Sequence, residues 1–317
     1  RDPQAQSEAN LSLAEMLFKK NMFKEALPYY AKVIATKVAS SRGLAAYRKS
    51  WSHFNLGQIA DSLAQIKQIL TDKSLQTKSG ISDGTADLQF LEEVAKDYAT
   101  FLSKQPYGEN EVKELYELVP EKAKLPTVTT LALETERVGR RREAIMTWNF
   151  VLNKQSQPEG RLEIMAHLSP LQWAEGQTEI AQQNFKSSLD IWNELKGCGK
   201  KDCEDVRKLF RQFVVTWNQA EKTKPSANLL MTYKVYSTQF PEDLEVAVWG
   251  AQAARQVKDY STSLFLYETA AKTLNQAGQD SAKLESALLS QIEVAEESGD
   301  AAALEKAQAA YLANTKL

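Results

Sequence analysis

The sequence predicts an all-α protein, and three observations support this fold class. The 317 residues include only thirteen Gly and nine Pro, and most Gly stand singly between long stretches of helical pattern. Apolar residues recur every three or four positions, as Ile59, Leu63, Ile66 and Leu70 do in residues 58–70, which is the period of an amphipathic helix. No stretch alternates apolar and polar residues around a Gly-Asn type of turn, so the pattern does not support hairpins of strands.

The helices are predicted to come in pairs, each joined by a short break. Six breaks carry a single residue that interrupts the helical pattern: Asn21, Gly57, Gly139, Gly176, Lys258 and Gly299. Prolines mark two more, at Gln105-Pro106 and Lys224-Pro225. The breaks define units of about 34 to 48 residues. Units of this size predict a solenoid, in which each helical pair buries its apolar face against its neighbours.

Composition excludes several other classes of protein. Hydrophobic residues make up 43% and charged residues 25%, as in ordinary globular proteins. The formal net charge of -2 argues against a nucleic-acid partner. No apolar run approaches the ~20 residues of a membrane-spanning helix, so we expect no direct membrane span. Because the chain begins at Arg1 without Met or an apolar leader, we expect a mature or excised fragment.

The units resemble tetratricopeptide repeats. That family has a small residue in the first helix, a turn, a small residue in the second helix and then a large residue. The first small position is Ala14, Ser50, Ala132, Ser169 and Ala251. The second small position is Ala26, Ser62, Ala144, Ala181 and Ser263. The large position is Tyr30, Ile66, Trp148, Phe185 and Tyr267. Small residues let paired helices approach, and the large residue fills the space to the next pair.

The resemblance implies a right-handed superhelix of about eight helical hairpins. The units centred on Gln105 and Lys224, and the last unit, match the family pattern poorly. Trp217 stands where the family has a small residue, so the register of that unit is open.

Two organisations of the chain are compatible with these repeats. One is a single solenoid over residues 1–317. The other adds a tandem super-repeat, residues 40–158 and 159–277 with flanking units 1–39 and 278–317, because three pairs of breaks are each 119 residues apart. Residue identity between the two copies is low, so coincidence stays an alternative.

No catalytic apparatus is visible in the sequence. The two histidines, His53 and His167, have no metal-ligand spacing, and glycine-rich phosphate loops are absent. We therefore expect no enzymatic activity, no cofactor and no metal site.

The two cysteines, Cys198 and Cys203, lie in one glycine-containing linker. A local disulfide fits this spacing better than a metal site or a redox pair, and two free thiols are the alternative. A disulfide would favour a periplasmic or other extracytoplasmic location, and free thiols a cytoplasmic one.

Two basic stretches could bind phosphate or an acidic partner. The first is Arg137, Arg140, Arg141 and Arg142, and the second is Lys200, Lys201, Arg207, Lys208 and Arg211. Solvated charges at a helix end are the simpler interpretation of both.

The resemblance also implies where a partner binds, because first helices line the concave groove of tetratricopeptide arrays. Counting along the first helices places twelve residues on that side: Tyr47, Arg48, Trp51, Asn55, Arg137, His167, Trp173, Asn218, Lys222, Trp249, Gln252 and Arg255. Aromatic residues and Arg are the usual energetic anchors of interfaces. Some of the twelve are expected to pack under a neighbouring unit instead.

These features favour a non-enzymatic scaffold that binds a protein or peptide in its groove, and by analogy with similar arrays a place in a bacterial envelope complex. One alternative is a small-molecule or glycan sensor in which Trp51, Trp173 and Trp249 stack on the ligand. Another is an accessory domain of a larger enzyme. The Lys and Asn progression of a carboxylate clamp is absent over consecutive units, which argues against a co-chaperone.

Overall fold

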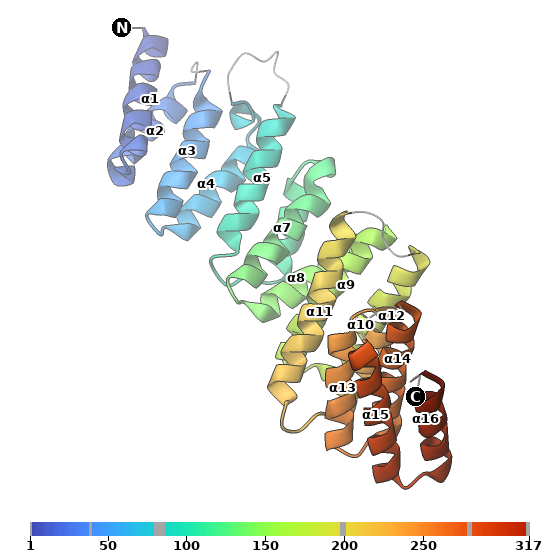
Figure 1. Ribbon diagram of the computed structural model, residues 1–317. Helices are drawn as coiled ribbons and strands as arrows, with labels where there is room; N and C mark the ends of the chain where they lie inside the picture. The colour runs from blue at the N-terminus through green and yellow to red at the C-terminus, as the bar shows by residue number, and fades with distance from the viewer. Residues whose placement is uncertain (1, 38–39, 79–85, 197–200, 278–280, 315–317) are drawn as a thin grey trace. The chain divides into compact units, whose positions relative to one another are not determined.

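The computed structural model describes residues 2–37, 40–78, 86–196, 201–277 and 281–314 (Figure 1). In these ranges every regular element is helical, so the all-α prediction is confirmed. Contacts divide the chain into two compact units, residues 1–156 and residues 157–317. The single solenoid over the whole chain and the 119-residue super-repeat stay predictions.

The first unit contains four helical hairpins. Its α-helices are α1 (Pro3–Lys19), α2 (Phe23–Ala35), α3 (Arg42–Asn55), α4 (Ile59–Thr71), α5 (Leu88–Leu102), α6 (Glu109–Leu118), α7 (Lys124–Arg137) and α8 (Arg141–Lys154). Two short 3-10 helices are η1 (Lys73–Leu75) and η2 (Glu121–Ala123).

The second unit contains another four hairpins. Its helices are α9 (Pro158–Ala174), α10 (Thr178–Glu194), α11 (Lys201–Glu221), α12 (Ala227–Gln239), α13 (Leu244–Gln256), α14 (Tyr260–Ala277), α15 (Ser281–Ser298) and α16 (Ala301–Asn314). In both units the helices contact mainly those next to them in the sequence, which is the packing of a solenoid. The predicted all-α solenoid fold class is therefore confirmed, with four hairpins in each unit among the described residues.

The turns inside six of the hairpins fall at the predicted break residues. All six single-residue breaks adopt a positive φ, between 59° at Asn21 and 80° at Gly139. In five of them the next backbone N–H reaches back to a carbonyl five residues earlier, which closes the end of the first helix. These bonds are Met22 to Leu17 (2.9 Å), Gln58 to His53 (2.9 Å), Arg140 to Thr135 (3.1 Å), Gln177 to Gln172 (2.8 Å) and Asp259 to Ala254 (2.9 Å).

The packing positions of the repeat are buried as the resemblance implied. All ten small residues of the five matching units have an exposed fraction of 1% or less, and their large residues reach at most 4%, at Tyr267. The hairpins therefore have the packing of tetratricopeptide-like units.

The two poorly matching hairpins are held by other contacts. In the α5–α6 loop the hydroxyl of Tyr107 lies 2.8 Å from the hydroxyls of both Thr135 and Thr147, which belong to the next hairpin. In the α11–α12 hairpin Trp217 is fully buried, and its indole donates to Glu221 at 2.7 Å. In this hairpin a large aromatic side chain therefore occupies the position where the other hairpins have a small residue.

Candidate functional site

The candidate site is a groove between α11 and α13, two first helices of the second unit. Its pocket has a volume of about 490 Å³. The residues that line it are Val215, Asn218, Gln219, Lys222, Trp249, Gln252, Ala253 and Gln256. Four of the twelve residues that the sequence assigned to the groove side meet here, namely Asn218, Lys222, Trp249 and Gln252.

Side-chain amides dominate the chemistry of this groove. Asn218, Gln219 and Gln252 have no side-chain hydrogen bond to any residue that the structure describes, and the amine of Lys222 likewise has no ion-pair partner there. Gln256, in contrast, donates to the Thr223 carbonyl at 2.9 Å. An unpaired amide offers both a donor and an acceptor, which is what a peptide main chain requires.

Trp249 supplies the large apolar surface of the groove. Its side chain is half-buried, and the guanidinium of Arg211 lies 5.8 Å from its ring centroid. Arg211 is itself held by Asp243 at 2.8 Å and by Glu245 at 2.5 Å. The ring orientation is therefore supported by a fixed cation, and the indole surface remains part of the pocket.

A second, more apolar pocket lies on the other side of α13. It has a volume of about 250 Å³ and is lined mainly by Leu244, Val248, Tyr267, Leu274 and Ala287. Gln252 borders both pockets. The two pockets are therefore adjacent: the first is lined by α11 and α13, and the second by α13, α14 and α15.

Arg255 is less available than its position on α13 suggested. Its guanidinium donates to Glu297 at 2.6 and 3.0 Å and to Glu293 at 2.9 Å, both on α15. These bonds raise the pKa of Arg255 above its ordinary value. A partner that used Arg255 would have to share it with two carboxylates.

In the first unit, Tyr47 and Trp51 of α3 pack against α5. The Tyr47 hydroxyl lies 2.6 Å from Asp97 Oδ2, and Trp51 Nε1 donates to the same oxygen at 2.8 Å. Tyr47 has an exposed fraction of 6%, so a partner would contact little of it. Burial raises the pKa of Asp97 above the ordinary carboxyl value, although the two hydrogen bonds act in the opposite direction.

Three further predicted residues of the first unit have partners within the chain. Arg48 pairs with Glu15 of α1 at 3.4 Å and lies over the Phe18 ring. Asn55 donates to the Trp51 carbonyl, and Arg137 is exposed and pairs with Glu134. Of these, Asn55 and Arg137 are the more exposed to a partner.

The other two predicted residues lie on α9. Trp173 is half-buried and packs against Phe213 and Trp217 of α11, with ring centroids 6.4 and 5.9 Å apart. His167 is half-buried on the same helix. Partner binding by these residues, as by the rest of the twelve, stays a prediction.

The described cations of the two basic stretches have partners within the protein, whereas Lys200 and the side chain of Lys201 lie outside the described residues. Arg140 donates to the Lys104 carbonyl at 3.0 Å. Arg207 pairs with Glu242, and Lys208 pairs with Asp205 at 2.7 Å. The structure thus pairs these cations with groups of its own helices, as expected for charges at helix surfaces.

Sequence reasoning missed half of the residues that line the α11–α13 pocket. Val215, Gln219 and Lys222 follow one another on the same face of α11 at spacings of four and three residues. Helical periodicity could therefore have identified Val215 and Gln219 once Lys222 was placed in the groove. On α13, Gln256 is exposed one turn after Gln252, whereas Ala253 is largely buried beside it.

Several other predictions fall outside what the structure tests. Cys198 and the side chain of Cys203 lie outside the described residues, so their pairing stays a prediction. Across the described ranges no group of three or more His, Cys, Asp and Glu side chains could hold a metal. None of the described helices combines the length and the apolar character that crossing a membrane requires.

Comparisons with known proteins give weak similarities to solved helical structures. No family model matches the chain, and no curated protein does. Similar solved structures include BtubC (BKLC) from P. vanneervenii, with 16% identity, 72% of this chain and 92% of that chain covered, and a TM-score of 0.32. The C-terminal part of a TPR repeat-containing protein from Cytophaga hutchinsonii has 15% identity, 95% and 94% coverage, and a TM-score of 0.29. The P58(IPK) TPR domain has 15% identity, 98% and 99% coverage, and a TM-score of 0.21.

Proposed function

We propose that this protein is a non-enzymatic scaffold that binds an extended peptide of a partner protein along the first helices of its second unit. The observation that carries the proposal is the α11–α13 groove, where the unpaired amides of Asn218, Gln219 and Gln252 lie beside the Trp249 ring. Peptide main chains need donors and acceptors at short intervals, and an aromatic surface takes up an apolar side chain.

The two pockets bordering Gln252 suggest the sequence preference of that peptide. The larger pocket combines Trp249 with Lys222, which favours a side chain that is apolar at its base and acidic at its tip. The smaller pocket, with Leu244, Val248 and Leu274, favours an aliphatic side chain. We therefore expect peptides in which an acidic residue and an aliphatic residue lie close together.

Selection from a displayed library of random peptides on the full chain tests this proposal. A variant with Lys222→Ala, Trp249→Ala and Gln252→Ala should lose the selected peptides at least tenfold, because truncating interface anchors commonly costs about 2 kcal/mol each. The matched control carries Asn193→Ala, Met231→Ala and Thr238→Ala on the second helices α10 and α12. If the groove variant remains folded and binds as well as the control, the groove is not the binding site.

A glycan ligand is the second candidate, because the same groove joins a Trp ring to several amides in a volume of about 490 Å³. This volume lies within the range of small-ligand sites. Binding of simple oligosaccharides that depends on Trp249, with no selected peptide, would favour this alternative.

Placement of the scaffold in a bacterial envelope complex is part of the same proposal. It is supported by the two cysteines, Cys198 and Cys203, whose pairing is itself a prediction, and by analogy between repeat arrays. An accessory role in a larger enzyme would be recognised from any further domain of the gene product.

A further inference from the structure

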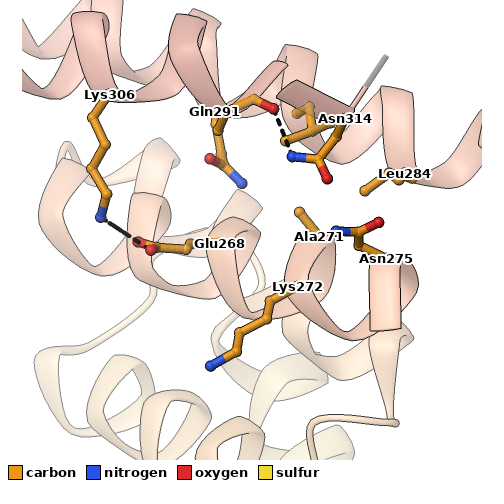
Figure 2. A pocket seen from close by; sticks show the side chains of 10 residues that line it. Glu268, Ala271, Lys272, Asn275, Leu284, Gln291, Lys306 and Asn314 are labelled. Atoms are coloured by element: carbon orange, nitrogen blue, oxygen red, sulfur yellow. Dashed lines mark hydrogen bonds and ion pairs between the residues drawn. The ribbon is translucent and has the colours of Figure 1, made fainter. Parts of the chain in front are cut away.

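A separate pocket of about 230 Å³ lies among α14, α15 and α16 (Figure 2). Two of these helices are the second helices of their hairpins, so the pocket is distinct from the α11–α13 groove. Side chains that line it include Ala271, Leu284, Leu288, Gln291 and Ala310. Small residues create the space, because Ala271 of α14 and Ala310 of α16 stand where larger side chains would fill it.

Gln291 of α15 supplies the amide group that lies deepest among the side chains of this pocket. Its exposed fraction is 6%, and it has no side-chain hydrogen bond to any residue within the described ranges. Figure 2 shows the amide pointing into the space between Ala271 and Asn314. The amide therefore faces the pocket with its donors and its acceptor unused, so a ligand with a polar tip can bond to it.

The rim of the pocket carries polar groups of two kinds. The side chains of Asn275 and Lys272 have no partner among the described residues, whereas Lys306 and Glu268 pair with each other at 2.9 and 3.0 Å. Asn314 uses its amide N–H on the Ala310 carbonyl at 2.7 Å. The buried end of the pocket is therefore neutral, and the free donors lie at its mouth.

We propose that this pocket receives the side chain of a tyrosine from a protein partner. The ring would lie against Ala271, Leu284, Leu288 and Ala310, and the phenol hydroxyl would bond to the Gln291 amide. Asn275 and Lys272 would bond to the partner's main-chain carbonyls at the mouth. This inference is independent of the α11–α13 groove and of what binds there.

Size and polarity both support a tyrosine. An apolar cavity of about 150 Å³ is large enough for benzene, so this pocket has room for one substituted ring. Tyrosine combines an apolar ring with a single polar tip, and it is among the commonest interface anchors. A phenylalanine would leave Gln291 unpaired, and a carboxylate would meet no cation at the buried end.

The experiment uses the full chain and a defined probe, N-acetyl-tyrosinamide, with N-acetyl-phenylalaninamide and p-cresol as comparators. Binding is followed by two-dimensional NMR of side-chain amides, in which the Gln291 signal is the one missing from Gln291→Leu. Ala310→Leu should fill the pocket, whereas Ala309→Leu changes an exposed residue of the same helix that does not line it.

We expect the tyrosine probe to shift the Gln291 amide with a Kd on the order of 1 mM, as fits a ligand of this size. Its affinity should exceed that of the phenylalanine probe by about three- to tenfold, the usual contribution of one hydrogen bond. Ala310→Leu should weaken binding at least about tenfold, Ala309→Leu should leave it unchanged, and Gln291→Leu should abolish the preference for tyrosine.

Four results would overturn the proposal. Equal affinity for the two amino-acid probes would exclude the bond to Gln291. Binding that is unchanged in folded Ala310→Leu, or absent up to about 20 mM probe, would exclude the pocket. Affinity of p-cresol as high as that of the tyrosine probe would identify a free phenol as the ligand in place of a protein.

Discussion

The hydroxyl of Ser263 on α14 donates a 2.8 Å hydrogen bond to the carbonyl oxygen of Ala251 on α13. These two residues are the second and first small positions of one hairpin, and both are fully buried. The bond therefore joins the paired helices at the point where their backbones are expected to be closest, and it adds a polar contact to what small side chains alone provide.

Ser263→Ala should lower the free energy of unfolding of the second unit by about 1 kcal/mol, because a buried bond between two helices is lost and the Ala251 carbonyl loses one partner. Ser169→Ala is the matched control, since Ser169 is equally buried but bonds to Met165 one turn earlier in its own helix. Urea unfolding followed by circular dichroism measures both. A larger loss for Ser169→Ala would contradict this assignment.

Gly250→Ala should lower the free energy of unfolding by about 1–3 kcal/mol. This loss is the opposite of the usual effect, because replacing Gly by Ala inside a helix normally stabilises it by up to about 1 kcal/mol. A Cβ at this position would lie 2.7 Å from Cγ of Tyr233 and 2.9 Å from Cδ1 of Leu266. Thermal unfolding should show the loss. Gly108→Ala is the control, because its Cβ would meet only the tip of Glu111 at 3.4 Å, and an equal loss there would point to a general effect of removing glycine.

Asp97→Asn should stabilise the first unit more at pH 7 than at pH 4. The folded pKa of Asp97 is raised by burial, with a smaller contribution in the same direction from Glu93. A raised folded pKa stabilises the fold below the unfolded pKa of about 4, and this contribution is lost as pH rises through the folded value. Asn removes the titration and keeps an oxygen to accept from Tyr47 and Trp51.

Urea unfolding of the Asp97→Asn variant and of the unchanged protein at both pH values gives the difference directly. Asp61→Asn, at an exposed position of α4, controls for the loss of one negative charge. A benefit of Asp97→Asn that is the same at pH 4 and pH 7 would contradict a raised pKa.

Cys198 and Cys203 should be joined in protein recovered from an oxidising compartment. Titration of thiols in unfolded, unreduced protein should then find almost none, and reduction should lower stability by roughly 2 kcal/mol for so short a ring. Alkylation before and after reduction, read by mass spectrometry, provides the measurement. Two reactive thiols in protein prepared without reductant would remove the argument for the periplasm.

The sequence was sufficient for the helical hairpins because their signals are local. Gly57 and Gly139 mark turns through their own backbone freedom, and Ala14 or Ala26 marks close packing through its size. The resemblance then placed Tyr30 and Trp148 correctly in the core. Even Asn21 and Lys258, which are not glycines, could be identified because the helical pattern stops at them.

The candidate site was harder to predict, because the exposure of a side chain on one helix depends on which part of that helix its neighbour covers. Helical periodicity places Trp51 and Trp249 on comparable faces of first helices. However, the indole of Trp51 meets Asp97 and Phe101 of α5, whereas that of Trp249 borders a pocket. The α14–α16 pocket was missed for a related reason, since Ala271 and Ala310 look like ordinary packing residues until three helices are assembled.

The glycine turns inside the hairpins also offer places where a label could be attached. A Cβ added at Gly57, Gly139 or Gly176 would meet no atom within 4 Å, so these turns face open space. Each hairpin is held by its own buried contacts, and the turn residue takes no part in them. The glycines themselves have to stay, because their positive φ would strain any other residue. A reporter peptide or a fluorophore placed beside such a turn, with its glycine kept, should therefore be carried without disturbing the array, which gives a way to label individual hairpins.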